Sequence, residues 1–355
     1  MLYKDKSFVG NPIISVCIPT FNQEKYISET LDSILSQVID VPYEIIIADD
    51  CSSDNTLNIC LDYQNRYPEK IILVSNEQNQ GLIINLFDVI FSNVSGKYIA
   101  LCAGDDVWVS QKKLKIQYDI LDGSNNVSVV HTGYNKFYEE KNQLIPIKFW
   151  DSPLLKFSGK EALKDVILEH FTFYPVASSM MFRKKTIDRY RLKFDNLIYD
   201  KNALGEGLIL QSFLILDGVF AFVPEIMVNY RIRKESMCHI MDKEKQLIFN
   251  IRYRILQKTL ISRTFLDGNN LIKRINRTFL SLYIEAINNK CEEIFLNQYY
   301  DYKKENAHNI SLFVKFSITF ISMNSINKKI AQIFINTFFR IKNQIINAKL
   351  KPLDT

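Results

Sequence analysis

Short apolar runs alternate with amphipathic helical segments through residues 12–135 of this chain. Each apolar run ends in a polar loop, and the segment that follows carries apolar residues at helical spacing. Strands that are apolar throughout and that alternate with helices predict a parallel sheet covered by helices on both faces. The runs lie at 13–18, 43–48, 71–75, 97–102 and 127–131.

Polar side chains gather where these predicted strands end. In open parallel sheets, ligands bind outside the carboxyl ends of the strands, so four loops that are distant in sequence are expected to meet at one edge. The residues are Thr20 after the first strand, Asp49 and Asp50 after the second, Asn79 after the third, and Asp105 and Asp106 after the fourth.

Asp105 and Asp106 form a pair of adjacent carboxylates that needs a compensating cation or hydrogen-bond donor. Adjacent side chains of an extended segment point to opposite sides, so one Asp can bind a metal while the other accepts a hydroxyl group. Carboxylates, water and phosphate are ligands that Mg2+ or Mn2+ prefers. The alternative is that Asp106 or Ser110 caps the helix that contains Leu114.

The distribution of charge and the spacing of the cysteines exclude several classes of protein. The formal net charge is +5, and residues 311–351 contain seven basic and no acidic residues, so the rest of the chain is close to neutral. This balance argues against a protein built around nucleic acid. The six cysteines lack CxxC spacing, and no secretory signal or apolar run of about 20 residues is visible, so we expect a cytoplasmic protein.

The basic segment 311–351 has apolar residues at helical spacing. Such a helix can lie on an anionic membrane surface, or it can pack on the catalytic domain with solvated lysines. Both possibilities stay open. The chain has no GxxxxGK[ST] motif and no GxGxxG after its first strand, so any phosphate must be bound by a metal and basic side chains.

A series of motifs resembles family 2 glycosyltransferases of the GT-A fold. The series consists of VCIPTFN at 16–22, IIADDCSSDNT at 46–56, NQG at 79–81 with Asn85, GKYIA at 96–100 and DDVW at 105–108. Order and spacing together are far more specific than any one of these motifs. The resemblance implies an α/β GT-A fold, which is a Rossmann-like, mostly parallel central sheet flanked by helices.

The resemblance also implies roles for residues at the strand ends. Pro19 and Thr20 match the loop that lies along the nucleotide, and Asp50 matches the acid that reads the base. Asp106 matches the carboxylate that binds the divalent metal, Mn2+ or Mg2+. Asp105 matches the one that contacts the ribose or the waters of the metal.

Two later segments complete the predicted site. Glu206, between two glycines, resembles the acid that deprotonates the acceptor hydroxyl, although Asp is usual there. The competing acids are Asp195, Asp200 and Glu225, with Asp200 ranked second. Favourable charge at a helix start also explains Glu206 and is compatible with the catalytic role. The segment 228–236, VNYRIRKES, resembles the closing segment of these enzymes, with Arg233 where His is usual. Arg231 and Arg233 can contact a diphosphate but are poor metal ligands. A solvated basic loop is the alternative.

The expected plan is a catalytic domain at 1–240, with a nucleotide-sugar-binding half at 12–135 and an acceptor-side half at 136–240, followed by a helical region at 241–355. The resemblance implies inverting transfer from a nucleotide sugar, with a UDP-sugar as first candidate. The acceptor would be a saccharide or lipid-linked saccharide of surface polysaccharide synthesis, at the inner face of the membrane. The rivals are a catalytically silent carbohydrate-binding protein and a sugar-nucleotide pyrophosphorylase, which would need a glycine-rich basic loop where Pro19 and Thr20 stand.

Overall fold

The computed structural model describes most of the first 264 residues and part of the remainder. The described residues are 1–3, 11–147, 163, 166–167, 175–191, 205–233, 242–264 and scattered positions between 275 and 298. The chain divides into two compact units, Met1–His239 and Ile240–Thr355. Asp195, Asp200 and the basic segment 311–351 lie outside the described residues.

Four parallel strands form one half of the sheet, in the order β4-β3-β2-β5. They are β2 (Ile14–Thr20), β3 (Tyr43–Asp49), β4 (Ile71–Ser75) and β5 (Tyr98–Leu101). These are the first four apolar runs of the sequence, and the prediction of parallel strands is confirmed for them. Burial on both faces explains why each is apolar throughout.

The other half of the sheet is mixed. Beyond β5 the described strands follow in the order β9-β7-β10-β6, with β8 on β7 and β1 on β4 at the far edge. β9 is antiparallel to both β5 and β7, whereas β7 and β10 run parallel. The run at 127–131 is therefore not the next parallel strand after β5, because a later segment inserts between them. The strands are β1 (Leu2–Tyr3), β6 (Val107–Trp108), β7 (Val127–Tyr138), β8 (Gln143–Ile147), β9 (Met180–Arg183) and β10 (Val219–Ile232).

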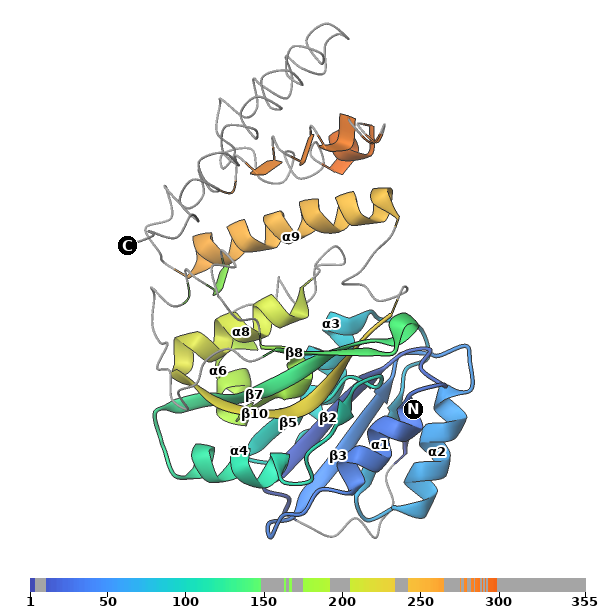
Figure 1. The fold of residues 1–355 in the computed structure, drawn as a ribbon, viewed down its shortest axis with the longest axis vertical. Helices are drawn as coiled ribbons and strands as arrows, with labels where there is room; N and C mark the ends of the chain where they lie inside the picture. The colour runs from blue at the N-terminus through green and yellow to red at the C-terminus, as the bar shows by residue number, and fades with distance from the viewer. Residues whose placement is uncertain are drawn as a thin grey trace, which may run out of the picture. The chain divides into compact units, whose positions relative to one another are not determined.

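Helices cover both faces of this sheet. In Figure 1, α1 and α4 lie on one side of the strands, and α6 and α8 lie on the other. In the first unit the helices are α1 (Ile27–Leu35), α2 (Thr56–Arg66), α3 (Leu82–Ile84), which continues as the π-helix η1 (Asn85–Ile90), α4 (Lys113–Asp122), α6 (Lys184–Arg191) and α8 (Glu206–Asp217), with 3-10 turns η2 (Glu139–Lys141) and η3 (Ala177–Ser179). The second unit contains α9 (Lys243–Arg263). No helix in the described part of the chain combines the length and apolarity needed to cross a membrane.

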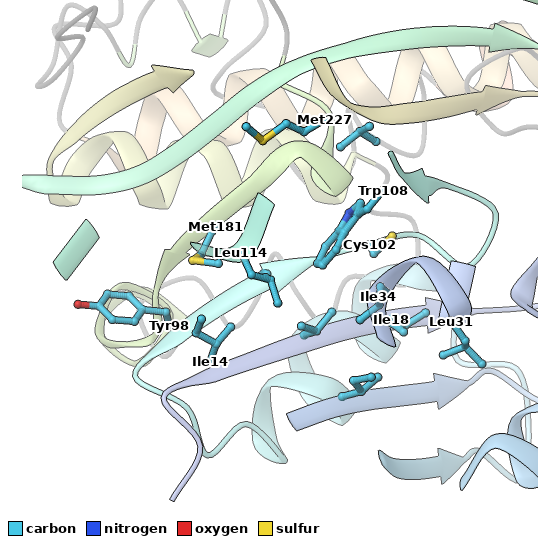
Figure 2. Close-up of a cluster of buried hydrophobic side chains, with 14 of the residues drawn as sticks. Ile14, Ile18, Leu31, Ile34, Tyr98, Cys102, Trp108, Leu114, Met181 and Met227 are labelled. Atoms are coloured by element: carbon cyan, nitrogen blue, oxygen red, sulfur yellow. The ribbon is translucent and has the colours of Figure 1, made fainter. Parts of the chain in front are cut away.

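A buried apolar cluster fixes the sheet against α1 and α4. Figure 2 shows Ile18 of β2 close to Leu31 and Ile34 of α1, whereas Ile14, at the other end of β2, lies near Leu114 of α4. All five side chains are fully buried. Because strand and helix positions are both set by this packing, the loops at the carboxyl ends of the strands start from a rigid frame.

Gly218 alone connects α8 to β10. A Cβ atom at this position would lie 2.6 Å from the carbonyl oxygen of Asn126 and 3.1 Å from Cβ of Ser128, so the link runs directly against the start of β7. The helix and the following strand are therefore held together both covalently and by packing.

Candidate functional site

The loops after β2, β3 and β4 meet, as the sequence predicts. The amide of Asp50 donates to the carbonyl oxygen of Thr20 at 2.9 Å, and the amide of Asn76 donates to that of Asp49 at 2.9 Å. Thr20 is buried, and its hydroxyl lies 2.7 Å from Oε1 of Gln23. Pro19 precedes it in β2, paired with the backbone of β3. This edge places Pro19, Thr20 and Asp50 together.

Asp50 organises the loop that follows β4. Its carboxylate accepts hydrogen bonds from the side-chain amide of Asn76 and from the backbone N–H groups of Gln80 and Gly81, each at 2.8 Å. Gly81 has φ +84°, a conformation that favours glycine. The carboxylate is thus already used to shape the loop, and its role in reading the base stays a prediction.

Asp106 lies in the loop between β5 and β6, directly before β6, and is only 1% exposed. One carboxylate oxygen accepts the backbone N–H of Arg231 at 2.8 Å, and the other accepts the hydroxyl of Ser178. Burial, followed by the charge of Asp105, raises the pKa of Asp106 well above its usual value. Helix α4 starts at Lys113 without a side-chain cap, so the alternative that Asp106 caps this helix is wrong.

Ser178 is a site residue that the motif pattern does not identify. It lies in η3, and its hydroxyl accepts the N–H of Ala103 at 2.9 Å while donating to Asp106. Its carbonyl accepts the indole N–H of Trp108 at 3.0 Å. Ser178 therefore holds both ends of the loop that carries the acidic pair. A serine before an apolar run is the only signal in the sequence, and it does not reveal this long-range contact.

Asp105 pairs with Arg233. The two side chains are 14% and 18% exposed, and Oδ2 of Asp105 lies 2.7 Å from a terminal nitrogen of Arg233. Burial raises the pKa of Asp105, and the Arg233 guanidinium opposes that shift. Nε of Arg233 is buried, and no hydrogen-bond partner for it lies in the described part of the chain. The guanidinium carbon also lies 5.0 Å from the ring centre of Tyr26, close enough for a cation–π contact.

Arg231 braces the acidic loop. Besides the backbone contact to Asp106, its Nε donates to the carbonyl oxygen of Asp105 at 2.8 Å. Its terminal nitrogens lie 2.7 Å from Glu29 and 3.4 Å from Glu139. The side chain is 8% exposed. The alternative of a solvated basic loop is therefore wrong for Arg231, and the low exposure of Arg233 contradicts it there as well.

The carboxylates do not fit the divalent metal site that the sequence predicts. Both oxygens of Asp106 accept protein hydrogen bonds, and Asp105 is neutralised by Arg233. Among the described residues, no group of three or more His, Cys, Asp or Glu side chains is placed to hold a metal ion. In this donor set the guanidinium of Arg233 already supplies the positive charge that a metal ion would bring.

Glu206 is the first residue of α8 and follows Gly205, which has φ +96°. Its side chain is partly buried. Burial raises the pKa of Glu206, while the backbone N–H groups of Glu206 and Gly207 at the helix start oppose the shift. A carboxylate with a raised pKa is a stronger base once ionised. Among the described residues, no hydrogen bond or ion pair joins Glu206 to Asp105 or Asp106, and its role as the base stays a prediction.

Comparisons with known proteins agree on the family. The model of "Glycosyl transferase family 2" matches residues 15–191. An uncharacterised protein of Mycobacterium tuberculosis is 28% identical over 249 residues, which span 70% of this chain and 66% of that protein. TuaG of Bacillus subtilis, named as a glycosyltransferase of teichuronic acid biosynthesis, is 31% identical over 157 residues, 44% of this chain and 59% of TuaG.

The crystal structure of S. aureus TarS 1-349 in complex with UDP-GlcNAc superposes with a TM-score of 0.61 at 16% identity and covers 91% of each chain. At this identity the superposition shows a shared fold, the GT-A fold that the motifs imply. The motif series, the fold and the family model are in agreement on the same part of the molecule. Through residues 15–191, the chain belongs to glycosyl transferase family 2.

Proposed function

We propose that this protein transfers a sugar, with inversion, from a nucleotide-sugar donor to an acceptor hydroxyl. The observation that supports it most is the cluster of Asp105, Asp106, Arg231 and Arg233 at the carboxyl edge of the sheet. The nucleotide would lie along Pro19, Thr20 and Asp50, beside this cluster. Its diphosphate would then face the arginines.

In the proposed step, the acceptor oxygen bonds to C1 of the donor sugar from the face opposite the diphosphate. The C1–O bond to the diphosphate breaks, and its electron pair stays on the nucleotide diphosphate. Glu206 takes the proton of the acceptor hydroxyl. Hydrogen bonds from the arginine side chains stabilise the charge that develops on the leaving group.

The names of the relatives suggest the substrates to test first. TuaG is named for teichuronic acid biosynthesis, and TarS was crystallised with UDP-GlcNAc. We propose a UDP-sugar donor and a saccharide or lipid-linked saccharide acceptor in surface polysaccharide synthesis. The sequence predicts Mn2+ or Mg2+ on Asp105 and Asp106, but the protein partners of these carboxylates do not fit that prediction, and assays with either ion or with EDTA test it. A catalytically silent protein of this fold would release no nucleotide under any of these conditions.

Glu206→Gln is expected to lower transfer at least about 100-fold while leaving donor binding intact, because a general base contributes about 10²–10⁴ to the rate. Transfer is followed by release of the nucleoside diphosphate, and donor binding by calorimetry. Glu225→Gln, which removes an exposed acid of β10, is the matched control and should keep the parent rate. A parent rate in Glu206→Gln would refute the assigned base.

Residues 311–351 are proposed to attach the enzyme to an anionic membrane surface, because seven basic and no acidic residues fall there. The full chain should co-sediment with vesicles containing phosphatidylglycerol at low salt and be released at high salt. A variant with the seven basic residues changed to Gln should lose most of this binding. Equal sedimentation of both proteins would contradict membrane attachment through these residues.

A further inference from the structure

Arg233 has a donor with no hydrogen-bond partner among the residues that the structure describes. One terminal nitrogen contacts Asp105 at 2.7 Å, while Nε is buried and pairs with none of those residues. Leaving a buried donor unpaired costs about 1–3 kcal/mol, so such groups in native structures call for an explanation. A bound anion that accepts from Nε would supply one.

The neighbouring arginine does not share this property. Arg231 is matched by Glu29 and Glu139, and its Nε is paired with the carbonyl oxygen of Asp105. Tyr26 stacks against both guanidinium groups, at 4.7 Å from that of Arg231 and 5.0 Å from that of Arg233. Within this cluster, Arg231 holds the acidic loop in place, and Arg233 carries the N–H donor that no described residue accepts.

We propose that Arg233 binds the diphosphate of the nucleotide sugar directly and replaces the divalent cation predicted on Asp105 and Asp106. This inference rests on the proposed function, because it assumes a nucleotide-sugar donor. A guanidinium presents its N–H groups in a planar fork that fits phosphate oxygens, and it keeps its charge at any working pH. Asp105 orients the fork by holding one terminal nitrogen.

The replacement also suits the reaction. As the bond from C1 to the diphosphate oxygen breaks, the electron pair moves onto that oxygen, and the negative charge there grows. Arg233 would donate hydrogen bonds to this oxygen or its neighbours, while the acceptor proton goes to Glu206. No redox change and no further reactant is needed. Transfer should then proceed in the presence of EDTA.

Nucleotide binding to the metal-stripped full chain tests this inference. The probes are UDP, GDP, CDP and dTDP with their monophosphates, measured by calorimetry in EDTA. The parent protein should bind one diphosphate about 10–100-fold more tightly than its monophosphate, as a charged hydrogen bond to phosphate predicts. Arg233→Met should abolish this preference. Arg66→Met removes an exposed arginine of α2 and should leave it unchanged.

Arg233→His supplies the sharpest comparison, because His can bind a metal. Its preference for the diphosphate should return only when Mn2+ is added. Arg233→Lys keeps the charge and covers the case in which Arg233→Met does not fold; its preference should fall but persist in EDTA. If the parent protein prefers the diphosphate only with Mn2+, Arg233 does not replace the metal. If no nucleotide binds with or without Mn2+, the proposed function itself fails.

Discussion

Asp106→Ala is expected to lower the free energy of unfolding by about 2–4 kcal/mol. The substitution removes the acceptor of two buried donors, the backbone N–H of Arg231 and the hydroxyl of Ser178. It also frees the loop between β5 and β6 from the turn that precedes β9. Urea unfolding followed by circular dichroism measures the change.

Asp106→Asn is the matched control for this prediction. The amide oxygen can still accept the N–H of Arg231, and the amide nitrogen can donate to Ser178, so the loss of stability should stay below about 1.5 kcal/mol. Binding of a nucleoside diphosphate in EDTA should also persist. The structural role of Asp106 would be refuted if Asp106→Ala unfolded like the parent, and loss of Mn2+-dependent binding in the stable Asn variant would mark Asp106 as a metal ligand.

Lys113→Met should stabilise the protein at pH 6 and remove most of its stability change between pH 7 and 10. Lys113 is fully buried in α4, and burial lowers its pKa to about 7. The unfolded lysine titrates near pKa 10.4. Between these values the unfolded chain binds more protons, so the stability of the parent should rise by about 1.4 kcal/mol per pH unit. Below pH 7, Lys113 is charged in the folded protein, and the cost of burying that charge lowers the free energy of unfolding of the parent in full.

The methionine variant also loses two contacts of Lys113. One is the hydrogen bond from Nζ to Gln117 at 2.7 Å, and the other is the cation–π contact of Nζ with Trp108, 4.0 Å from the ring centre. These losses offset part of the gain at pH 6. Lys115→Met is the control, because Lys115 lies in the same helix but is exposed beside Asp119. Its unfolding free energy should follow the parental pH profile. Parallel profiles for Lys113→Met and the parent would show that Lys113 stays charged in the fold.

The sequence predicts the strands β2 to β5 well because each is a continuous apolar run bounded by a polar loop. It also predicts that Thr20, Asp50 and the acidic pair follow strand ends, since that is a property of short motifs. The partners of the acids are a different matter. Ser178, Arg231 and Arg233 contact Asp105 and Asp106 because β9 and β10, which lie beside them in the chain, pair with distant strands of the sheet. Local periodicity carries no information about those pairings.

The predicted metal illustrates the same limit. Two adjacent carboxylates require a compensating group, and the residue types alone predict that requirement. Which group supplies it depends on tertiary contacts that lie outside the motif. In the folded chain, a guanidinium, a hydroxyl and a backbone N–H meet the two carboxylates. Residue types predict that the two carboxylates need a compensating group, but they do not predict that this group is an arginine of a later strand.

The single-residue link at Gly218 has an evolutionary consequence. It places the proposed base, at the start of α8, and both arginines, at the end of β10, on one uninterrupted stretch of chain. Because a Cβ atom at Gly218 would lie 2.6 Å from the carbonyl oxygen of Asn126, substitution of this glycine is disfavoured. Exchange of this stretch between related genes would carry the proposed base and Arg233 together.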